Sequence, residues 1–255
     1  MFMMPTTFGR NMNTTRAIVF DGVNESVSYP DSGGVTSFGD GSNDSAFCIV
    51  FWVKLNFNRG IQVLGKGSST SSVEYSVHTD SGRNPHNVKY DLTSANRIDK
   101  DYGGTWETSE WDQIIMEWNN TDVTDSRDLK MFDDLVEDTG TDLATIGTYV
   151  AMHATGDDFT VGLDILGNDF LDGQIMHISV HDRLLTADEK EALFGAHGYP
   201  QDPNAYDFGC VAHFPVGTGD DVTTSNAMQD LVGGLSGTAS NLIVSDYVYA
   251  GLPGD

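Results

Sequence analysis

The chain has 255 residues with 38 acidic and 13 basic side chains, so its formal net charge at pH 7 is −25. This charge argues against nucleic-acid binding, because phosphate affinity comes from clusters of Lys and Arg. The same argument disfavours docking on an anionic membrane surface. The length suffices for one hydrophobic core, and all-β sandwiches often reach it as a single domain. The 28 glycines and the excess of Asp over Glu suit many turns and few helices.

Residues 1–16, MFMMPTTFGRNMNTTR, lack apolar periodicity, and we expect them to form an N-terminal arm. The segment has neither the basic stretch nor the continuous apolar stretch of a secretory signal peptide. No other window approaches the run of about 20 apolar residues that a transmembrane helix requires. We therefore expect a protein that is made in the cytoplasm, folds without Sec-type export and does not insert in a membrane.

Strand patterns rich in β-branched and aromatic residues follow in chain order. They are Ala17–Val27 (AIVFDGVNESV), Phe47–Lys54 (FCIVFWVK) and Trp111–Trp118 (WDQIIMEW). The polar stretch Thr79–Glu110 separates the last two of these patterns. A loop of that length is uncommon in a compact domain unless it is functional.

The segment Phe170–Phe194, FLDGQIMHISVHDRLLTADEKEALF, predicts a turn, a strand and a short helix in fixed order. Asp172–Gly173 is turn chemistry, and Ile175, Ile178 and Val180 supply the apolar face of the strand, with His177 fitting it less cleanly. Thr186 is an N-cap with Glu189 three residues on, so the two form a capping box. We expect the helix over residues 186–194, ending at Gly195.

These segments resemble, in the same order, the motifs of the laminin-G-like branch of the concanavalin A-like lectin and glucanase superfamily. Segment 170–194 is similar to the closing pattern G-x-I-x-x-x-x-I/V-x-x-R-x-L-T/S-x-x-E-I, and the earlier segments look like the FDG, FTISFWVK and W-x-x-I strands of that branch. The resemblance covers about residues 17–195. It implies an all-β fold, a two-sheet antiparallel jelly-roll sandwich over residues 17–196, and does not specify a ligand.

Residues 197–255 are expected to form an extended C-terminal tail that contributes one or two strands and packs on the sandwich or on a partner. Its apolar stretches are 210–216 and 241–249. The run 209–242 is similar to the tails of structural proteins of marine tailed phages. Asp230, Gly233, Gly237–Thr238 and Asn241 keep the spacing of that pattern, whereas His213–Phe214 stands in place of its Trp-Trp pair.

Two cysteines, Cys48 and Cys210, are too few for a disulfide framework. Both lie in apolar surroundings, which favours two buried free thiols over a bridge that ties the tail to the sandwich.

Calcium is the ion that the acidic composition favours, because hard cations take carboxylate and carbonyl oxygens from Asp-rich loops. Asp157–Asp158 and Asp220–Asp221 are candidate ligands, although no EF-hand spacing is present. The alternative is that the charge serves solubility and mutual repulsion between copies. No cofactor is required on either interpretation.

Catalysis is disfavoured by the absence of any E-x-D-x-E strand, the arrangement that places two carboxylates on one face in glucanases of this superfamily. The chain also lacks G-x-S-x-G, H-E-x-x-H and C-x-x-C motifs, so we expect no enzyme. Sugar binding needs an exposed aromatic platform beside amide and carboxylate groups. The candidate glycan-binding residues in the 79–110 stretch are Trp106, Tyr102, Tyr90, Asn87 and His86. The alternative for Trp106 is packing beneath its own loop.

These observations predict a non-enzymatic virion surface protein, a capsid decoration or fibre-like protein, with glycan binding for attachment to a host or to the particle surface. Its expected partners are a major capsid protein, or its own copies in a homo-oligomer, and cell-surface glycans. One alternative is a free-standing bacterial carbohydrate-binding module or adhesin domain. Another is a degenerate glucanase.

Overall fold

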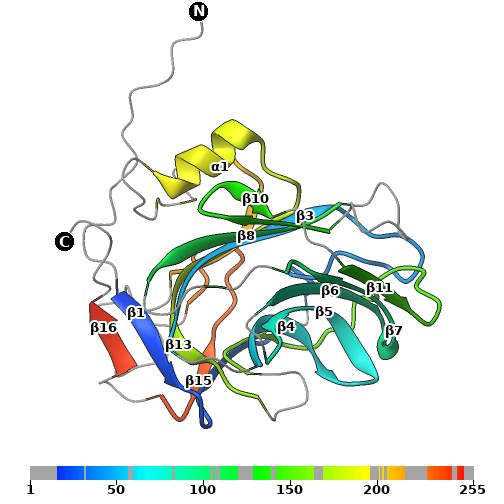
Figure 1. The fold of residues 1–255 in the computed structure, drawn as a ribbon, viewed down its shortest axis with the longest axis horizontal. Helices are drawn as coiled ribbons and strands as arrows, with labels where there is room; N and C mark the ends of the chain where they lie inside the picture. Colours follow the sequence, from blue (N-terminus) through cyan, green and yellow to red (C-terminus); the bar gives the residue numbers. More distant parts are fainter. Residues whose placement is uncertain are drawn as a thin grey trace, which may run out of the picture.

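The computed structural model describes residues 16–31, 33–56, 60–81, 84–103, 106, 110–119, 129–138, 142–163, 169–195, 201, 203, 206–215, 229–242 and 246–249. The predicted N-terminal arm, apart from its last residue, lies outside the described residues. Among these residues two eight-stranded antiparallel sheets pack face to face (Figure 1). This is the predicted all-β two-sheet sandwich.

The first sheet has the order β10 (Val136–Asp138), β9 (Leu129–Asp133), β8 (Asp112–Trp118), β3 (Phe47–Leu55), β13 (Asp172–His181), β1 (Arg16–Asp21) and β16 (Tyr247–Tyr249), and β14 (Cys210–Phe214) joins it by pairing with β13. The second sheet has the order β11 (Asp142–Ile146), β7 (Thr93–Asp101), β6 (Pro85–Asp91), β5 (Ser72–Thr79), β4 (Ile61–Ser69), β12 (Phe159–Val161), β2 (Ser26–Tyr29) and β15 (Thr238–Ser240).

The core fills the space between the sheets with side chains that alternate along each strand. On β3, Phe47, Ile49 and Phe51 belong to the main core, while Cys48 and Val50 face the opposite side. A strand buried on both faces needs an apolar side chain at nearly every position, which explains the unbroken run of β3. Tyr75 and Val77 supply the core side of β5 in the second sheet.

Helix α1 (Ala187–Phe194) covers the outer side of the first sheet (Figure 1). The predicted capping box is present, because the Thr186 side chain accepts from Glu189 N and the Glu189 carboxylate accepts from Thr186 N at 2.8 Å. Leu193 packs with Cys48 and Val50 of β3. The helix is too short to span a membrane, and no other described helix does so.

Strand β13 carries an irregularity that the apolar pattern had indicated at His177. The register against β3 shifts between Met176 and Ser179, and His177 has φ 50. Ile175, Ile178 and Val180 all belong to the core. The extra residue of the bulge therefore keeps both halves of the strand facing the core.

The tail adds three short strands, where one or two were expected. Strands β14 and β16 pair with β13 and β1 of the first sheet, and β15 pairs with β2 of the second. Phe214 lies in the core, with its ring centroid 4.0 Å from that of Tyr29. Cys48 and Cys210 are free thiols, as the sequence favoured, but only Cys48 is buried and Cys210 is partly exposed.

Candidate functional site

A hollow of about 290 Å³ lies over the outer face of the second sheet and takes its lining from four neighbouring strands. The alternation of β5 explains this placement, because Tyr75 and Val77 enter the core and His78 therefore points away from it. The lining residues are Gly60, Ile61, Gln62, Thr70, His78, Thr79, Tyr90, Ser94, Arg97, Asp99 and Asp169.

Cross-strand pairing brings the polar side chains of the floor together. Gln62 of β4 pairs with His78 of β5, His78 pairs with His86 of β6, and Tyr90 of β6 pairs with Arg97 of β7. The two imidazoles stack with centroids 4.9 Å apart and planes at 8°. Four strands that follow one another in the chain and pair side by side thus present one polar surface.

Asp99 is held in place by two basic neighbours. His86 Nδ1 donates to Asp99 Oδ1 at 2.9 Å, and Arg97 Nε lies 3.6 Å from Asp99 Oδ2. Burial alone would raise the pKa of Asp99, but the hydrogen bond and charge of His86, with the charge of Arg97, lower it. Burial alone would lower the pKa of His86, and Asp99 raises it above the ordinary value. The carboxylate is therefore ionised and fixed near neutral pH.

His78 is neutral at pH 7, because burial and the neighbouring His86 lower its pKa to about 4. Its Nδ1 lies 3.3 Å from Ser76 Oγ, which in turn lies 3.2 Å from the Tyr90 hydroxyl. A neutral imidazole has one donor and one acceptor nitrogen. The floor therefore offers groups of both kinds beside the aromatic ring of Tyr90.

The rim of the hollow is built by turns. Ser94 N donates to Thr70 O at 2.9 Å, which ties the turn after β4 to the start of β7. Arg97 Nη1 donates to Ser94 O at 2.6 Å, so the same turn also positions the guanidinium. Asp169, from the segment before β13, completes the lining.

The structure divides the predicted glycan-binding residues between two faces of the sheet. Tyr90 lines the hollow, although it is itself largely buried with an exposed fraction of 7%, and His86 stacks on the lining residue His78. Asn87, Tyr102 and Trp106 are corrected to interior residues, with exposed fractions of 0%, 2% and 1%.

The physical reason for this correction is alternation and packing. Asn87 follows His86 directly and so points to the opposite face of β6. Trp106 belongs to the main core and meets Phe51 edge to face, with centroids 6.3 Å apart. An indole packed in this way has no ring face open to a ligand.

The sequence did not predict that one site includes Gln62, His78, Arg97 and Asp99. A signal was present for His78, because β5 alternates apolar residues with polar ones, whereas β7 shows no such alternation around Arg97 and Asp99. Gln62 gives no comparable signal, since only the pairing of β4 with β5 places it beside His78.

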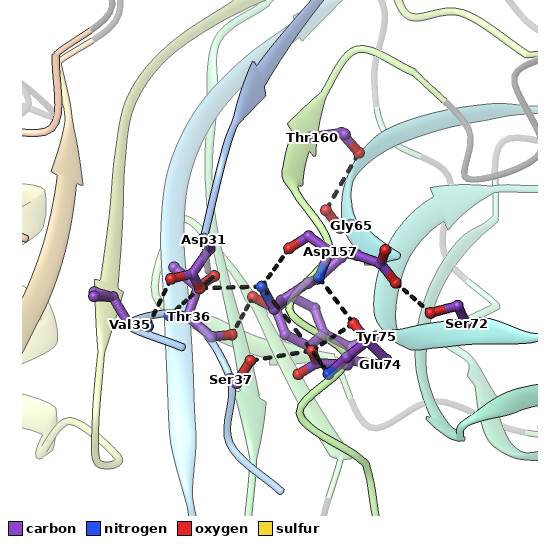
Figure 2. A network of polar contacts seen from close by, with 12 residues as sticks. Asp31, Val35, Thr36, Ser37, Gly65, Ser72, Glu74, Tyr75, Asp157 and Thr160 are labelled. Carbon is purple, nitrogen blue, oxygen red and sulfur yellow. Dashed lines mark hydrogen bonds and ion pairs between the residues drawn. The ribbon is translucent and has the colours of Figure 1, made fainter. Parts of the chain in front are cut away.

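The predicted calcium ligands Asp157 and Asp158 do not form an open cation site. The carbonyl oxygen of Asp157 accepts from Lys66 Nζ at 2.7 Å, and its carboxylate accepts from the Ser72 hydroxyl (Figure 2). Asp158 O accepts from Gly67 N at 3.4 Å. An ammonium group already faces the carbonyl that a metal would use. Asp220 and Asp221 lie outside the described residues.

A separate acidic group lies at the start of β8 and the β9–β10 hairpin. Ligand atoms of Asp112, Asp133 and Asp134 lie within 4.8 Å of one another. Burial, and the charges of Asp134 and Asp138, raise the pKa of Asp133 to about 6. Gln113 N donates to Asp134 Oδ1 at 3.0 Å, so the backbone of β8 already holds one of these carboxylates.

No family model matches the chain, and no curated protein matches it. Among solved structures, a Bacteroides ovatus protein proposed to bind carbohydrate is similar with a TM-score of 0.59 and 11% identity, over 94% of this chain and 61% of that one. A heptameric pentraxin from Limulus polyphemus has a TM-score of 0.47 and 10% identity, over 73% of this chain and 84% of that one. Domain 4 of an arabinanase from Geobacillus stearothermophilus, solved with arabinotriose, has a TM-score of 0.41 and 16% identity, over 58% of this chain and 66% of that one.

The chain has the concanavalin A-like jelly-roll fold, a two-sheet antiparallel sandwich with one short helix in its described part. It spans 61% of the length of the Bacteroides structure. At 11% identity this likeness establishes the fold alone.

Proposed function

We propose that the chain is a non-enzymatic carbohydrate-binding module and that the hollow over β4, β5, β6 and β7 is its sugar-binding site. The observation that carries this proposal is the convergence of Gln62, Tyr90, Arg97 and Asp99 on one hollow of about 290 Å³. Sugars present many hydroxyl groups, each a donor and an acceptor, around an apolar C–H face. A site for them needs charged and amide groups beside an aromatic ring.

Each wall group has a role in this scheme. The Asp99 carboxylate accepts from sugar hydroxyls, and the Arg97 guanidinium donates to them. The ring of Tyr90, and the imidazole of His78 stacked on that of His86, supply the aromatic surface for the apolar C–H face of a sugar. Because Asp99 is already fixed by His86 and Arg97, its side chain loses little conformational entropy when a ligand binds.

The size of the hollow favours a short ligand. Pockets for small molecules usually measure about 300–1,000 Å³, and this one measures about 290 Å³. We therefore propose that it takes one or two sugar rings at a time rather than a long stretch of polysaccharide.

The charge state of Asp99 supports binding over hydrolysis. A glycosidase needs a carboxylic acid with a raised pKa opposite a second carboxylate. The pKa of Asp99 is lowered instead, as the charges of His86 and Arg97 outweigh its burial. Its carboxylate is therefore an unsuitable general acid near neutral pH.

Glycan arrays followed by titration calorimetry test this site. The Asp99→Asn substitution removes a charged acceptor and should weaken binding by at least about 10-fold. The matched control is Asp188→Asn on the exposed side of α1, which should bind as the wild type does. Equal affinities of both variants and the wild type would place the sugar elsewhere. Release of reducing ends that Asp99→Asn abolishes would make the protein an enzyme.

Two settings for the module follow from the sequence. We favour a free-standing module or adhesin domain, because the described tail strands pair within the sandwich instead of extending from it. The second proposal, a location on a virion surface with capsid partners, rests on the sequence pattern of the tail. Mass spectrometry of purified virions tests it.

A further inference from the structure

Lys66 of β4 carries an ammonium group that is enclosed by oxygen atoms in the interior. Its Nζ donates to Asp31 Oδ2 at 3.0 Å and to Asp157 O at 2.7 Å, and it lies 3.9 Å from Glu74 Oε1. The side chains of Lys66, Asp31 and Glu74 are all 0% exposed. Figure 2 shows Asp31, Glu74 and Asp157 converging on one point from three separate segments.

The Asp31 carboxylate is held by the turn that follows it. Val35 N donates to Oδ1 at 2.7 Å, and Thr36 donates to Oδ2 from its N at 2.7 Å and from its hydroxyl at 2.5 Å (Figure 2). Burial alone would raise the pKa of Asp31, but the bonds from Thr36 and the charge of Lys66 lower it. The turn therefore sets the position of this oxygen, while the low pKa of Asp31 also depends on Lys66.

Glu74 gives the cluster more negative charge than one ammonium balances. Its Oε1 accepts from Ser37 Oγ and Thr155 Oγ1, each at 3.0 Å, and from Thr155 N at 2.9 Å. Its Oε2 is buried and has no hydrogen-bond partner. Two buried carboxylates thus face one cation, and burial raises the pKa of Glu74.

These oxygens are the kind that a hard divalent cation uses. Calcium binds carboxylate and backbone carbonyl oxygens that come from several segments. The cluster offers Asp31, Glu74 and the carbonyl of Asp157, with one carboxylate oxygen unused. The lysine chain reaches the position that such an ion would occupy.

We propose that Lys66 is an internal substitute for a metal ion, and that its ammonium fills an oxygen cage which would bind a divalent cation if the side chain were shortened. The cage joins residues 31, 35–37, 66, 74, 155 and 157. In the native chain these segments are held together by a covalently attached cation, so their packing is independent of added calcium.

A second buried lysine provides a matched comparison. Lys89 Nζ donates to Asp44 Oδ2 at 3.2 Å, and both side chains are almost fully buried. Asp44 also accepts from Met152 N at 2.8 Å and from the Tyr149 hydroxyl at 2.5 Å. This ammonium faces one carboxylate whose two oxygens both have partners. Removing it leaves no set of oxygens for a divalent ion.

The test compares Lys66→Ala, Lys89→Ala and the wild type in thermal unfolding, with a chelator and with Ca²⁺ at about 1–10 mM. Removing either lysine leaves a buried charge, so both variants should lose about 10 °C or more in the chelator. Lys66→Ala should regain most of that loss in Ca²⁺, and Lys89→Ala should regain none. Terbium luminescence excited through nearby tyrosines should show one site in Lys66→Ala that the wild type lacks.

The group of Asp112, Asp133 and Asp134 is common to all three proteins, so the measured quantity is the site that Lys66→Ala gains over the wild type. The double variant Asp31→Asn/Lys66→Ala removes a ligand and should lose that site. Three results overturn the proposal. They are an equal response of Lys66→Ala and Lys89→Ala to Ca²⁺, a gained site that survives Asp31→Asn, and a Lys66→Ala chain that stays unfolded at every Ca²⁺ concentration.

Discussion

At the scale of single residues, this acidic chain places several of its few cations in its interior. Lys66 holds Asp31, Lys89 holds Asp44, and Lys100 Nζ donates to the carbonyl of Leu129 at 2.7 Å. A buried charge is costly unless it is paired, and removing one member of a buried ion pair destabilises the protein more than replacing both members by apolar side chains. These lysines therefore fix the loops that they reach, and each loop depends on its lysine.

Trp106→Ala separates packing from binding. Because the indole is buried in the core, we expect the free energy of unfolding to fall by about 3–5 kcal/mol. Glycan affinity per folded molecule should stay unchanged, while Tyr90→Ala should weaken it. Chemical denaturation and calorimetry measure the two quantities. A Trp106→Ala protein that keeps native stability and loses glycan binding would show instead that the Trp106 indole stacks on the sugar.

At the scale of elements, the C-terminal strands complete both sheets. Strand β14 puts Ala212 and Phe214 into the main core, and β16 and β15 cover the edges of β1 and β2. Asp230 has a structural role here, since its Oδ1 accepts from His213 N at 2.7 Å and from Val232 N at 2.9 Å. The residue that matched the phage tail pattern thus fixes a turn.

Deleting residues 205–255 should prevent the remaining chain from folding. The deletion removes Phe214 from the core and exposes strand edges on both sheets. Near-ultraviolet circular dichroism and urea unfolding of the truncated chain measure the result. The single substitution Phe214→Ala, which keeps every strand, should fold and be less stable by about 3–5 kcal/mol. A cooperative unfolding transition in the truncated chain would mean that the sandwich closes without its tail.

At the scale of the whole molecule, titrating groups in both sheets set its response to acid. Burial lowers the pKa of His78 and His181 to about 4 and that of His177 to about 3. Above about pH 6.5 these side chains are neutral in both states. Below about pH 6.5 these histidines bind protons in the unfolded chain but not in the folded chain. The free energy of unfolding therefore decreases as the pH is lowered. Four groups with raised pKa values act in the opposite direction, namely His86, Asp133, Glu25 and Glu74.

We expect the melting temperature to fall from pH 7.5 to pH 5.0, because the three histidines outweigh the opposing groups. Each neutral histidine costs about 2 kcal/mol at pH 5.0. The His177→Asn variant, whose side chain tolerates the positive φ of this position, should show a shallower fall. Melting curves at both pH values check this. A slope that His177→Asn leaves unchanged would assign the acid response to other groups.

Much of the fold could be predicted because its signals are local. The capping box joins Thr186 to Glu189 within one helical turn. The nearly continuous apolar sequence of β3 indicates a strand that is buried on both faces. The candidate site was predicted only in part. Tyr90 and His86 lie within the polar stretch 79–110, whose length predicted a function. The sequence around Trp106 does not indicate whether its indole is exposed or buried.

The sequence by itself determined several strands and the short helix, because periodicity and capping act between residues a few positions apart, and the two-sheet class followed from the resemblance of its ordered motifs to a known superfamily. Only the tertiary structure decided that Gln62, His78, Arg97 and Asp99 share one hollow, and that Lys66 meets Asp31, Glu74 and Asp157. The first four groups lie within the consecutive strands β4 to β7, which pair side by side, whereas Asp31 and Asp157 come from distant segments that the pairing of β2, β12 and β4 brings to Lys66. That pairing depends on how the two sheets close over their common core, which no local pattern records.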